Sequence, residues 1–318
     1  MAVHRGREDR PVVIFIHGLG VDRSFWTDPE ETKILARNIP LRLFAAERPL
    51  AGPEEKAGGL TFGRVPAKVD NLWRILLQEG FSVLSWSQTR PAGPVAAAVE
   101  ELDHVLARAE GLFPGRPVAL IGHSRGGLIA RKSMEHRHPA VRALVTIASP
   151  HRGSSLSRLG NRLLPLSSAI QRLLPESARG TVAGVLRNLT ELIQGRALQE
   201  LMPGSDFITG LKDAPSHDVR YLSFGGNKTK MLTLYRWKQA GGRRSAQTLL
   251  SFPDSIVGLL PESIVPDELV SGRGDFMVTA ESAVLPWPGQ HYNLPENHIS
   301  ITWNRTVADH VVQLLQQL

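Results

Sequence analysis

One serine stands in a setting that favours nucleophilic chemistry. Ser124 lies in the run Gly122-His123-Ser124-Arg125-Gly126, between the apolar stretch "PVALI" and the helical stretch "GLIARKSM". Glycines on either side let a strand and a helix approach closely, and the sharp turn between them exposes the hydroxyl. The pattern therefore predicts a nucleophile at Ser124. The alternative is an ordinary glycine-rich turn between a strand and a helix.

A second glycine-rich stretch is placed to stabilise negative charge. His17-Gly18-Leu19-Gly20 follows the first strand-like run of the chain. A serine that attacks a carbonyl needs N–H donors for the developing oxyanion. One donor is expected from the loop after this strand and one from the residue after the serine. We therefore predict the backbone N–H groups of Leu19 and Arg125 as donors, whereas an ordinary strand-ending turn is the alternative.

The general base must be one of the 11 histidines. In the strand–turn–helix architecture the order along the chain is serine, acid, histidine, which leaves His217, His291 and His298. His298 lies in "PENHISITW", a loop before the last predicted helix, and is our choice, with His291 second. His136 and His138 are expected to be solvated or to cap the helix that follows Ser124.

The carboxylate that orients the base should end the strand before that loop. Asp275 in "SGRGDFMVT" follows a glycine, precedes an apolar triplet and comes 23 residues before His298. Glu281 is the nearest rival, in a turn or helix start, and Asp267 and Glu268 lie in an irregular stretch. We predict Asp275 as the orienting acid.

The elements that must position these residues alternate regularly from residue 11 to residue 150. This alternation predicts a mostly parallel sheet with helices on both faces, an α/β fold. Strands are expected at 11–18, 81–86, 117–122, 141–149 and 219–227, and helices at 66–80, 94–112, 125–137 and 306–318.

The sequence pattern changes after residue 150. Leucine-rich, arginine-punctuated helical segments occupy much of the stretch up to residue 213, which shows no strand pattern. We expect residues 154–202 to form a helical cap on a core of residues 1–153 and 203–318. Residues 228–270 are a second candidate insertion, with a hairpin near "MLTLYRW". The cap is expected either to shape a pocket or to act as a lid that adsorbs to a lipid interface.

Composition excludes several classes of protein. The net charge is +7, but the basic residues are scattered and aromatic residues make up only 6%, which argues against nucleic-acid binding. The absence of cysteine excludes disulfides and thiol nucleophiles. No transmembrane segment is expected. The start "MAVHRGREDR" lacks the apolar core of a signal peptide, so we expect a cytoplasmic protein, or a secreted one if a signal was trimmed.

Five motifs together carry a resemblance. In order, "FIHGLG", "LIGHSRGG", "TIASPHRGS", "GRGDFMVT" and "ENHISI" resemble the bacterial triacylglycerol lipase and carboxylesterase branch of the α/β-hydrolases. The resemblance implies an α/β-hydrolase fold and a serine hydrolase of lipid or small-molecule carboxylic esters, without a cofactor. It implies Ser124, Asp275 and His298 as triad, and Leu19 and Arg125 as oxyanion donors. It is weak across 155–202 and 228–270.

One position departs from that branch. Many members carry an aspartate two residues after the catalytic histidine, where it helps to hold a calcium ion, but Ser300 stands there in this chain. The nearest acidic residue upstream is Glu296. We therefore expect neither this calcium site nor a zinc site.

Other functions remain open for the same motifs. They are a phospholipid or glycolipid deacylase, an acyltransferase, and a non-catalytic receptor built on the hydrolase fold. The oligomeric state is left open.

Overall fold

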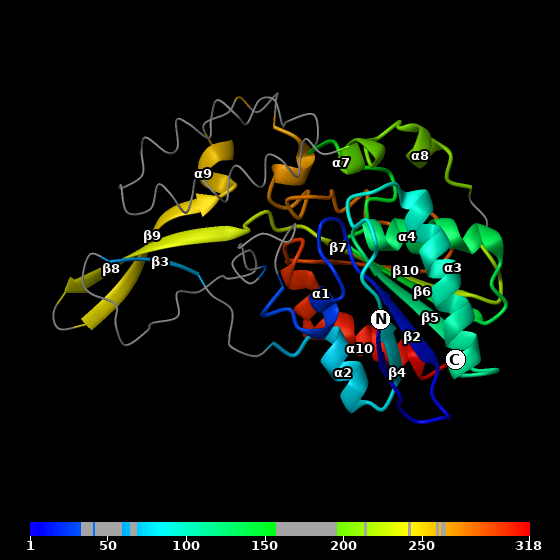
Figure 1. Cartoon of the computed structure of the whole chain (residues 1–318). Helices are drawn as coiled ribbons and strands as arrows, with labels where there is room; N and C mark the ends of the chain where they lie inside the picture. Colours follow the sequence, from blue (N-terminus) through cyan, green and yellow to red (C-terminus); the bar gives the residue numbers. More distant parts are fainter. Residues whose placement is uncertain are drawn as a thin grey trace.

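A seven-stranded sheet forms the centre of the computed structural model (Figure 1). The structure describes residues 1–32, 41, 59–63, 69–156, 196–212, 215–240, 243–258, 261 and 265–318. Neighbouring strands are parallel except at one edge, where β1 pairs antiparallel with β4. In spatial order the strands are β1 (Ala2–His4), β4 (Ser82–Ser85), β2 (Val12–Ile16), β5 (Val118–His123), β6 (Val141–Ile147), β7 (Arg220–Gly226) and β10 (Gln290–Leu294).

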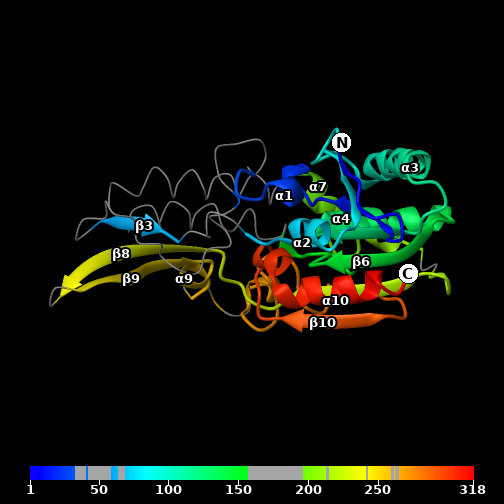
Figure 2. The same cartoon turned by 90° about the horizontal axis from the view of Figure 1, so that it is seen from below.

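The central strands are covered on both faces. Every residue of β2 and β5 is buried, which explains why these strands are continuous apolar runs and not alternating ones. The helices α3 (Val95–Leu112) and α4 (Arg125–Ser133) pack against each other on one face of the sheet, and α2 (Leu72–Gln78) and α10 (Arg305–Leu315) lie on the other (Figure 2). The sheet therefore has the layered α/β arrangement predicted from the sequence.

Helix boundaries follow local chemistry. The apolar residues of α3 that recur at helical spacing are buried: Val95, Val99, Leu102 and Leu106. α2 begins later than predicted, because the side chain of Asn71 accepts a hydrogen bond from the N–H of Arg74 and so caps the helix there. Residues 66–68 of the predicted helix lie outside the described residues. α1 (Ser24–Thr27) and the 3₁₀ segments η3 (Met134–His136) and η7 (Ser300–Trp303) complete this part of the fold.

A smaller antiparallel sheet extends away from the core (Figure 1). β8 (Leu232–Ala240) and β9 (Arg243–Phe252) form the hairpin expected near "MLTLYRW", within residues 228–270. β3 (Leu60–Phe62) joins β8 as a third strand, a pairing across more than 170 residues that no local pattern could indicate. The helix α9 (Asp254–Val257) follows β9 directly.

The expected cap is described only at its ends. Residues 157–195 of the predicted 154–202 insertion lie outside the described residues, and Arg196–Glu200 form the helix α7, followed by α8 (Asp206–Thr209). Among the described residues, no helix has the length and apolarity required to cross a membrane.

Candidate active site

Ser124 occupies a strained turn at the carboxyl edge of the sheet, between β5 and α4. Its backbone has φ 55° and ψ −127°, a positive φ that is uncommon for residues other than glycine. The two glycines of the motif are required by close packing: a Cβ on Gly122 would lie 2.5 Å from the carbonyl carbon of Gly126, and one on Gly126 would collide with the carbonyl oxygen of Ile16. The Ser124 N–H donates to the carbonyl of Ile147 (2.8 Å), which fixes the turn against β6.

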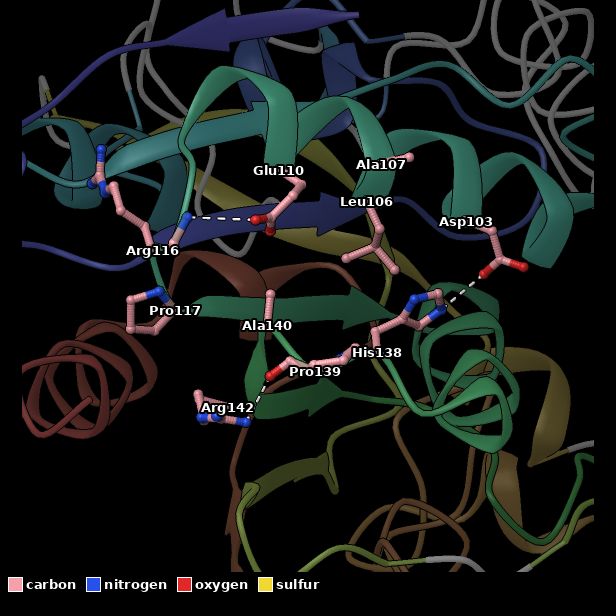
Figure 3. A pocket seen from close by; sticks show the side chains of 11 residues that line it. Asp103, Leu106, Ala107, Glu110, Arg116, Pro117, His138, Pro139, Ala140 and Arg142 are labelled. Atoms are coloured by element: carbon pink, nitrogen blue, oxygen red, sulfur yellow. Dashed lines mark hydrogen bonds and ion pairs between the residues drawn. The ribbon is translucent and has the colours of Figure 1, made fainter.

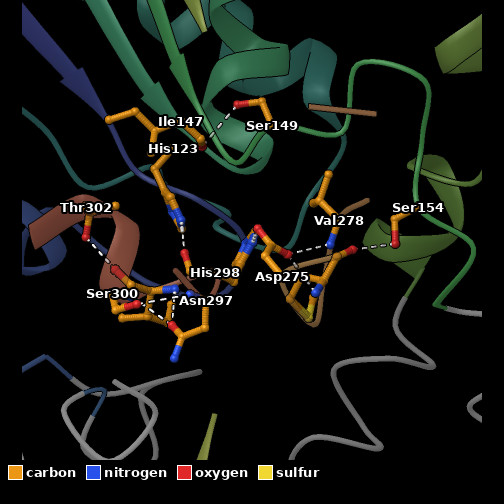
Figure 4. Close-up of polar contacts among 12 residues, drawn as sticks. His123, Ile147, Ser149, Ser154, Asp275, Val278, Asn297, His298, Ser300 and Thr302 are labelled. Atoms are coloured by element: carbon orange, nitrogen blue, oxygen red, sulfur yellow. Dashed lines mark hydrogen bonds and ion pairs between the residues drawn. The ribbon is translucent and has the colours of Figure 1, made fainter. Parts of the chain in front are cut away.

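Asp275 and His298 form a buried pair (Figure 4). The imidazole Nδ1 of His298 lies 2.9 Å from Oδ2 of Asp275. The other carboxylate oxygen accepts the N–H groups of Met277 (2.9 Å) and Val278 (2.7 Å), and the N–H of His298 donates to the carbonyl of Asp275 (3.0 Å). The carboxylate is thus held rigidly, with one oxygen left for the imidazole. This arrangement keeps the proton on Nδ1 and the lone pair on Nε2.

The position of Asp275 corrects the sequence-based expectation that it ends a strand. It lies in a turn-rich loop after the 3₁₀ segment η6 (Asp267–Leu269), between β7 and β10. The apolar residues after it do not form a strand, because two of their N–H groups bind the carboxylate and not a neighbouring strand. The loop still packs against the end of β7, where a Cβ on Gly226 would lie 2.8 Å from that of Asp275.

The rival acids have other partners. Glu281 is exposed and pairs with Arg152, and Asp267 bonds Arg273 (2.9 Å). Glu268 is buried, but its carboxylate accepts the N–H (2.6 Å) and the hydroxyl (2.8 Å) of Ser155. The second choice of base, His291, lies on β10 and contacts Ser223 Oγ (2.8 Å) and Asn293 Oδ1 (3.0 Å).

His123 connects the turn of Ser124 to the loop of His298. Its Nε2–H donates to the carbonyl of His298 (2.8 Å), and the two imidazole rings are 4.8 Å apart. Burial lowers the pKa of His123 well below its usual value, so this ring is neutral. The structure contains no hydrogen bond between Ser124 and His298, both of which are described. In unliganded enzymes this contact is often long and shortens when substrate binds.

The loop after β2 lies against the nucleophile turn, since a Cβ on Gly18 would lie 3.1 Å from that of Ser124. Within the described residues the N–H of Leu19 has no hydrogen-bond partner, whereas the next N–H, of Gly20, donates to the carbonyl of Pro91 (3.2 Å). Arg125 is the first residue of α4, where helix N–H groups lack partners within the helix. Both predicted donors therefore belong to the segments that meet at Ser124.

Comparison with known proteins identifies the family. Residues 13–305 match the family model described as "Alpha/beta hydrolase family". The chain belongs to the alpha/beta hydrolase family. No curated protein sequence matches this hydrolase significantly.

Solved structures support the same fold. The hydrolase is similar to Bacillus licheniformis lipase BlEst2 in mature form, with a TM-score of 0.56 and 18% sequence identity over 99% of this chain and 96% of that one. It is also similar to Aspergillus fumigatus lipase B, with a TM-score of 0.50 and 10% identity over 99% of this chain and 56% of that one. At these identities the likeness establishes the fold.

The side chain of Arg125 has a structural role that the sequence did not indicate. It is completely buried, donating from Nη1 to Gln88 Oε1 (2.7 Å) and from Nη2 to the carbonyl of Gly93 (2.5 Å). Burial lowers its pKa to about 10, so the guanidinium remains charged at neutral pH. Gln88 in turn donates from Nε2 to the carbonyl of His17 (3.1 Å) and from its backbone N–H to His17 Nε2 (3.1 Å). Arg125 and Gln88 thus hold the loop of Leu19 in place.

The stretch from Ser149 to Ser154 supports the loop that carries Asp275. Ser154 Oγ donates to the carbonyl of Met277 (2.7 Å), and the N–H of His151 donates to the carbonyl of Ser282 (2.8 Å). Ser282 Oγ donates back to the carbonyl of Gly153 (2.6 Å). These bonds join residues about 130 positions apart in the sequence. They give the stretch from Ser149 to Ser154 a supporting role that its local sequence pattern could not indicate.

The residues around Ser300 do not fit a calcium site. Ser300 Oγ donates to Glu296 Oε2 (2.5 Å), and the side-chain amide of Asn304 donates to Glu296 Oε1 (2.8 Å). Asn297 Oδ1 accepts the N–H groups of Ile299 (2.9 Å) and Ser300 (2.8 Å) (Figure 4). Both oxygens of the Glu296 carboxylate are therefore engaged by neutral donors, and hydrogen bonds organise the loop of His298.

His17 predicts a pH dependence of stability. Burial lowers its pKa in the folded state to about 4, from an ordinary value of 6.5. Above about pH 6.5 the His17 imidazole is neutral in both the folded and the unfolded chain, so it does not lower the free energy of unfolding. Between about pH 6.5 and 4 only the unfolded chain binds the proton, so His17 lowers the free energy of unfolding by about 1.4 kcal/mol per pH unit as pH falls.

We expect urea unfolding at several pH values across this window to show a steeper loss of stability in the unmodified protein than in His17→Gln. Titration of the His17 imidazole by NMR gives an independent measure in the folded protein. A folded-state midpoint near the unperturbed value of about 6.5 would contradict the prediction.

Proposed function

We propose that this hydrolase cleaves carboxylic esters through an acyl-enzyme intermediate. The observation that carries the proposal is the buried hydrogen bond between His298 Nδ1 and Asp275 Oδ2. His123, which directly precedes Ser124, hydrogen bonds the backbone of His298 and so connects this pair to the serine turn. An orienting carboxylate, an imidazole and a serine on a sharp turn are the parts of a serine esterase site.

The acylation step follows from these roles. Ser124 Oγ attacks the ester carbonyl while its proton passes to Nε2 of His298, and Asp275 stabilises the resulting imidazolium. The carbonyl oxygen becomes an oxyanion that accepts hydrogen bonds from the N–H groups of Leu19 and Arg125. His298 then protonates the departing alkoxide, and the acyl group remains on Ser124.

Deacylation uses the same groups with water as the nucleophile. His298 removes a proton from water, which attacks the acyl carbonyl, and the proton returns to Ser124 Oγ as the carboxylic acid leaves. No cofactor takes part in either step.

The substrate class is proposed from two observations. The chain shares its fold with proteins named lipases, and its resemblance in sequence motifs is to lipases and carboxylesterases. We propose small-molecule or lipid carboxylic esters as substrates. A series of p-nitrophenyl esters of increasing acyl length, measured beside triglyceride and phospholipid, tests the class and the preferred chain length.

The outcomes of this experiment are distinct. Hydrolysis of the esters, together with covalent labelling of Ser124 by a fluorophosphonate, supports the proposal. Faster release from phospholipid than from the other esters would assign a phospholipid deacylase, and acyl transfer to an added alcohol would assign an acyltransferase. Absence of both labelling and hydrolysis would overturn the proposal and favour a receptor.

Gln88 should affect turnover without contacting substrate. Gln88→Ala removes the acceptor of Arg125 Nη1 and the donor to the carbonyl of His17, so the loop that carries Leu19 loses its support. Because loss of one oxyanion donor costs roughly 10²–10³ in turnover, we expect displacement of the loop to lower kcat about 10-fold with little change in KM.

The exposed Gln316 provides a matched control, since Gln316→Ala should leave kcat unchanged. Steady-state kinetics on a p-nitrophenyl ester and the melting temperature separate two roles. A lower melting temperature with unchanged kcat would show that Gln88 is structural only.

A further inference from the structure

Three side chains of metal-ligating type meet at a site away from the candidate triad. His136 Nδ1 lies 2.9 Å from Oδ2 of Asp103, and His138 Nε2 lies 3.0 Å from Oδ1 of the same carboxylate. The ligand atoms of the three residues all lie within 4.8 Å of one another. Figure 3 shows the imidazole of His138 directed at Asp103 at the rim of a pocket. The histidines are solvated at the end of the helix, as expected from the sequence, but each also contacts Asp103, which the sequence did not indicate.

The fold builds this cluster from two packed helices. Asp103 lies on α3, and the histidines follow α4, which packs against α3. Arg137, between the two histidines, adopts a left-handed conformation (φ 50°, ψ 72°), and this turn lets the residues on both sides of it reach one carboxylate.

The cluster is separated from the candidate triad by the length of α4. Ser124 precedes this helix and His136 follows its far end. The nine residues of α4 span about 14 Å at 1.5 Å per residue. The last turn of a helix carries the negative end of its dipole, which favours a cation there.

We propose that Asp103, His136 and His138 bind one Zn²⁺ ion. Imidazole nitrogen and carboxylate oxygen are ordinary zinc ligands, and three protein ligands leave a fourth position for water. Each oxygen of Asp103 faces an imidazole nitrogen, so the ion would enter between groups that already converge. In each neutral imidazole the proton moves to the other ring nitrogen, which leaves a lone pair for the metal.

The surroundings allow an ion to enter. The side chains of Asp103, His136 and His138 are 32%, 47% and 23% exposed. The adjoining pocket has a volume of about 600 Å³ and includes Leu106 and Ala107 in its wall. It provides space for the fourth ligand.

Two arginines also line this pocket, so their charge bears on the proposal. The guanidinium of Arg116 donates to the carbonyl of Arg10 (3.0 Å), and that of Arg142 donates to the carbonyl of Pro139 (2.7 Å). Both cations are therefore engaged by backbone oxygens and not by Asp103.

A bound ion would join α3 to the end of α4, the helix that begins after Ser124. Because the ion binds the folded chain, Zn²⁺ should raise the melting temperature. The proposal departs from the sequence-based expectation of no metal site, and it is independent of the proposed esterase activity.

The test is a calorimetric titration of chelator-treated protein with Zn²⁺, and separately with Ca²⁺. We expect one Zn²⁺ per chain and no Ca²⁺ binding at this site, because Ca²⁺ prefers ligand sets made only of oxygen. His136→Ala and His138→Ala should each weaken Zn²⁺ binding at least ~10-fold, since even changes to outer-shell partners of metal ligands cost 10–100-fold. His4→Gln, an exposed histidine on β1, is the matched control.

Asp103→Asn is a conservative variant that preserves the fold, because its amide can still hydrogen bond the imidazoles. It should also weaken Zn²⁺ binding and abolish the rise in melting temperature with Zn²⁺, and circular dichroism verifies that each variant is folded. Absence of Zn²⁺ binding in the unmodified protein would overturn the proposal. Equal binding in the cluster variants and in His4→Gln would do so as well.

Discussion

Ser124→Ala should lower the turnover of a p-nitrophenyl ester by on the order of 10⁴-fold or more, with the fold intact. The substitution removes the oxygen atom proposed to form the acyl-enzyme, so water must then attack without covalent catalysis. The strained backbone at Ser124 is set by the packing of Gly122 and Gly126, and the N–H bond to Ile147 does not involve the side chain. The variant should therefore fold and bind substrate.

The measurement is kcat together with fluorophosphonate labelling, which should disappear in the variant. Ser245→Ala, at an exposed position on β9, is the control and should retain both activity and labelling. Turnover in Ser124→Ala within about 10-fold of the unmodified protein would remove Ser124 as the nucleophile.

Asp275→Asn should lower kcat by about 10⁴-fold, the size of effect known for this change in serine triads. One carboxylate oxygen of Asp275 accepts two backbone N–H groups, from Met277 and Val278. In the variant the amide oxygen must take that place, and the NH₂ group must then face Nδ1 of His298. The imidazole is forced to protonate Nε2 instead, so it can no longer accept the proton of Ser124.

The exposed rival Glu281 supplies the control for this prediction. Its side chain is 79% exposed, so Glu281→Gln should leave kcat unchanged. A comparison of kcat for the two variants on the same ester decides between the acids. Near-normal turnover in Asp275→Asn, or a comparable loss in Glu281→Gln, would reject Asp275 as the orienting acid.

The sequence was sufficient wherever the cause is local. The glycines around Ser124 indicate a sharp turn because any Cβ there would collide with backbone, and that steric demand acts within a few residues. The apolar runs of β2 and β5 indicate strands covered on both faces, and the alternation with helices indicates a parallel sheet. The order of the motifs was enough to pair Asp275 with His298 as candidates.

Other features were decided by contacts between distant parts of the chain. The apolar triplet after Asp275 resembles a strand, but its N–H groups bind the carboxylate. β10 was not expected from the sequence, because its residues are only partly buried at the edge of the sheet and show no apolar run.

Contacts between distant parts of the chain also explain the polar partners that the sequence did not indicate. Gln88 lies in a loop with no motif, and only the folded chain brings it between His17 and Arg125. Likewise, the sequence shows Asp103 only as one of several acidic residues on α3. In the folded chain the left-handed turn at Arg137 brings two histidines to it. Local sterics and periodicity thus determined the sheet and the nucleophile turn, and the order of the motifs indicated the pair Asp275 and His298. Tertiary packing alone determined polar contacts such as those of Gln88 and Asp103, because hydrogen bonds across the fold leave no periodic trace in the sequence.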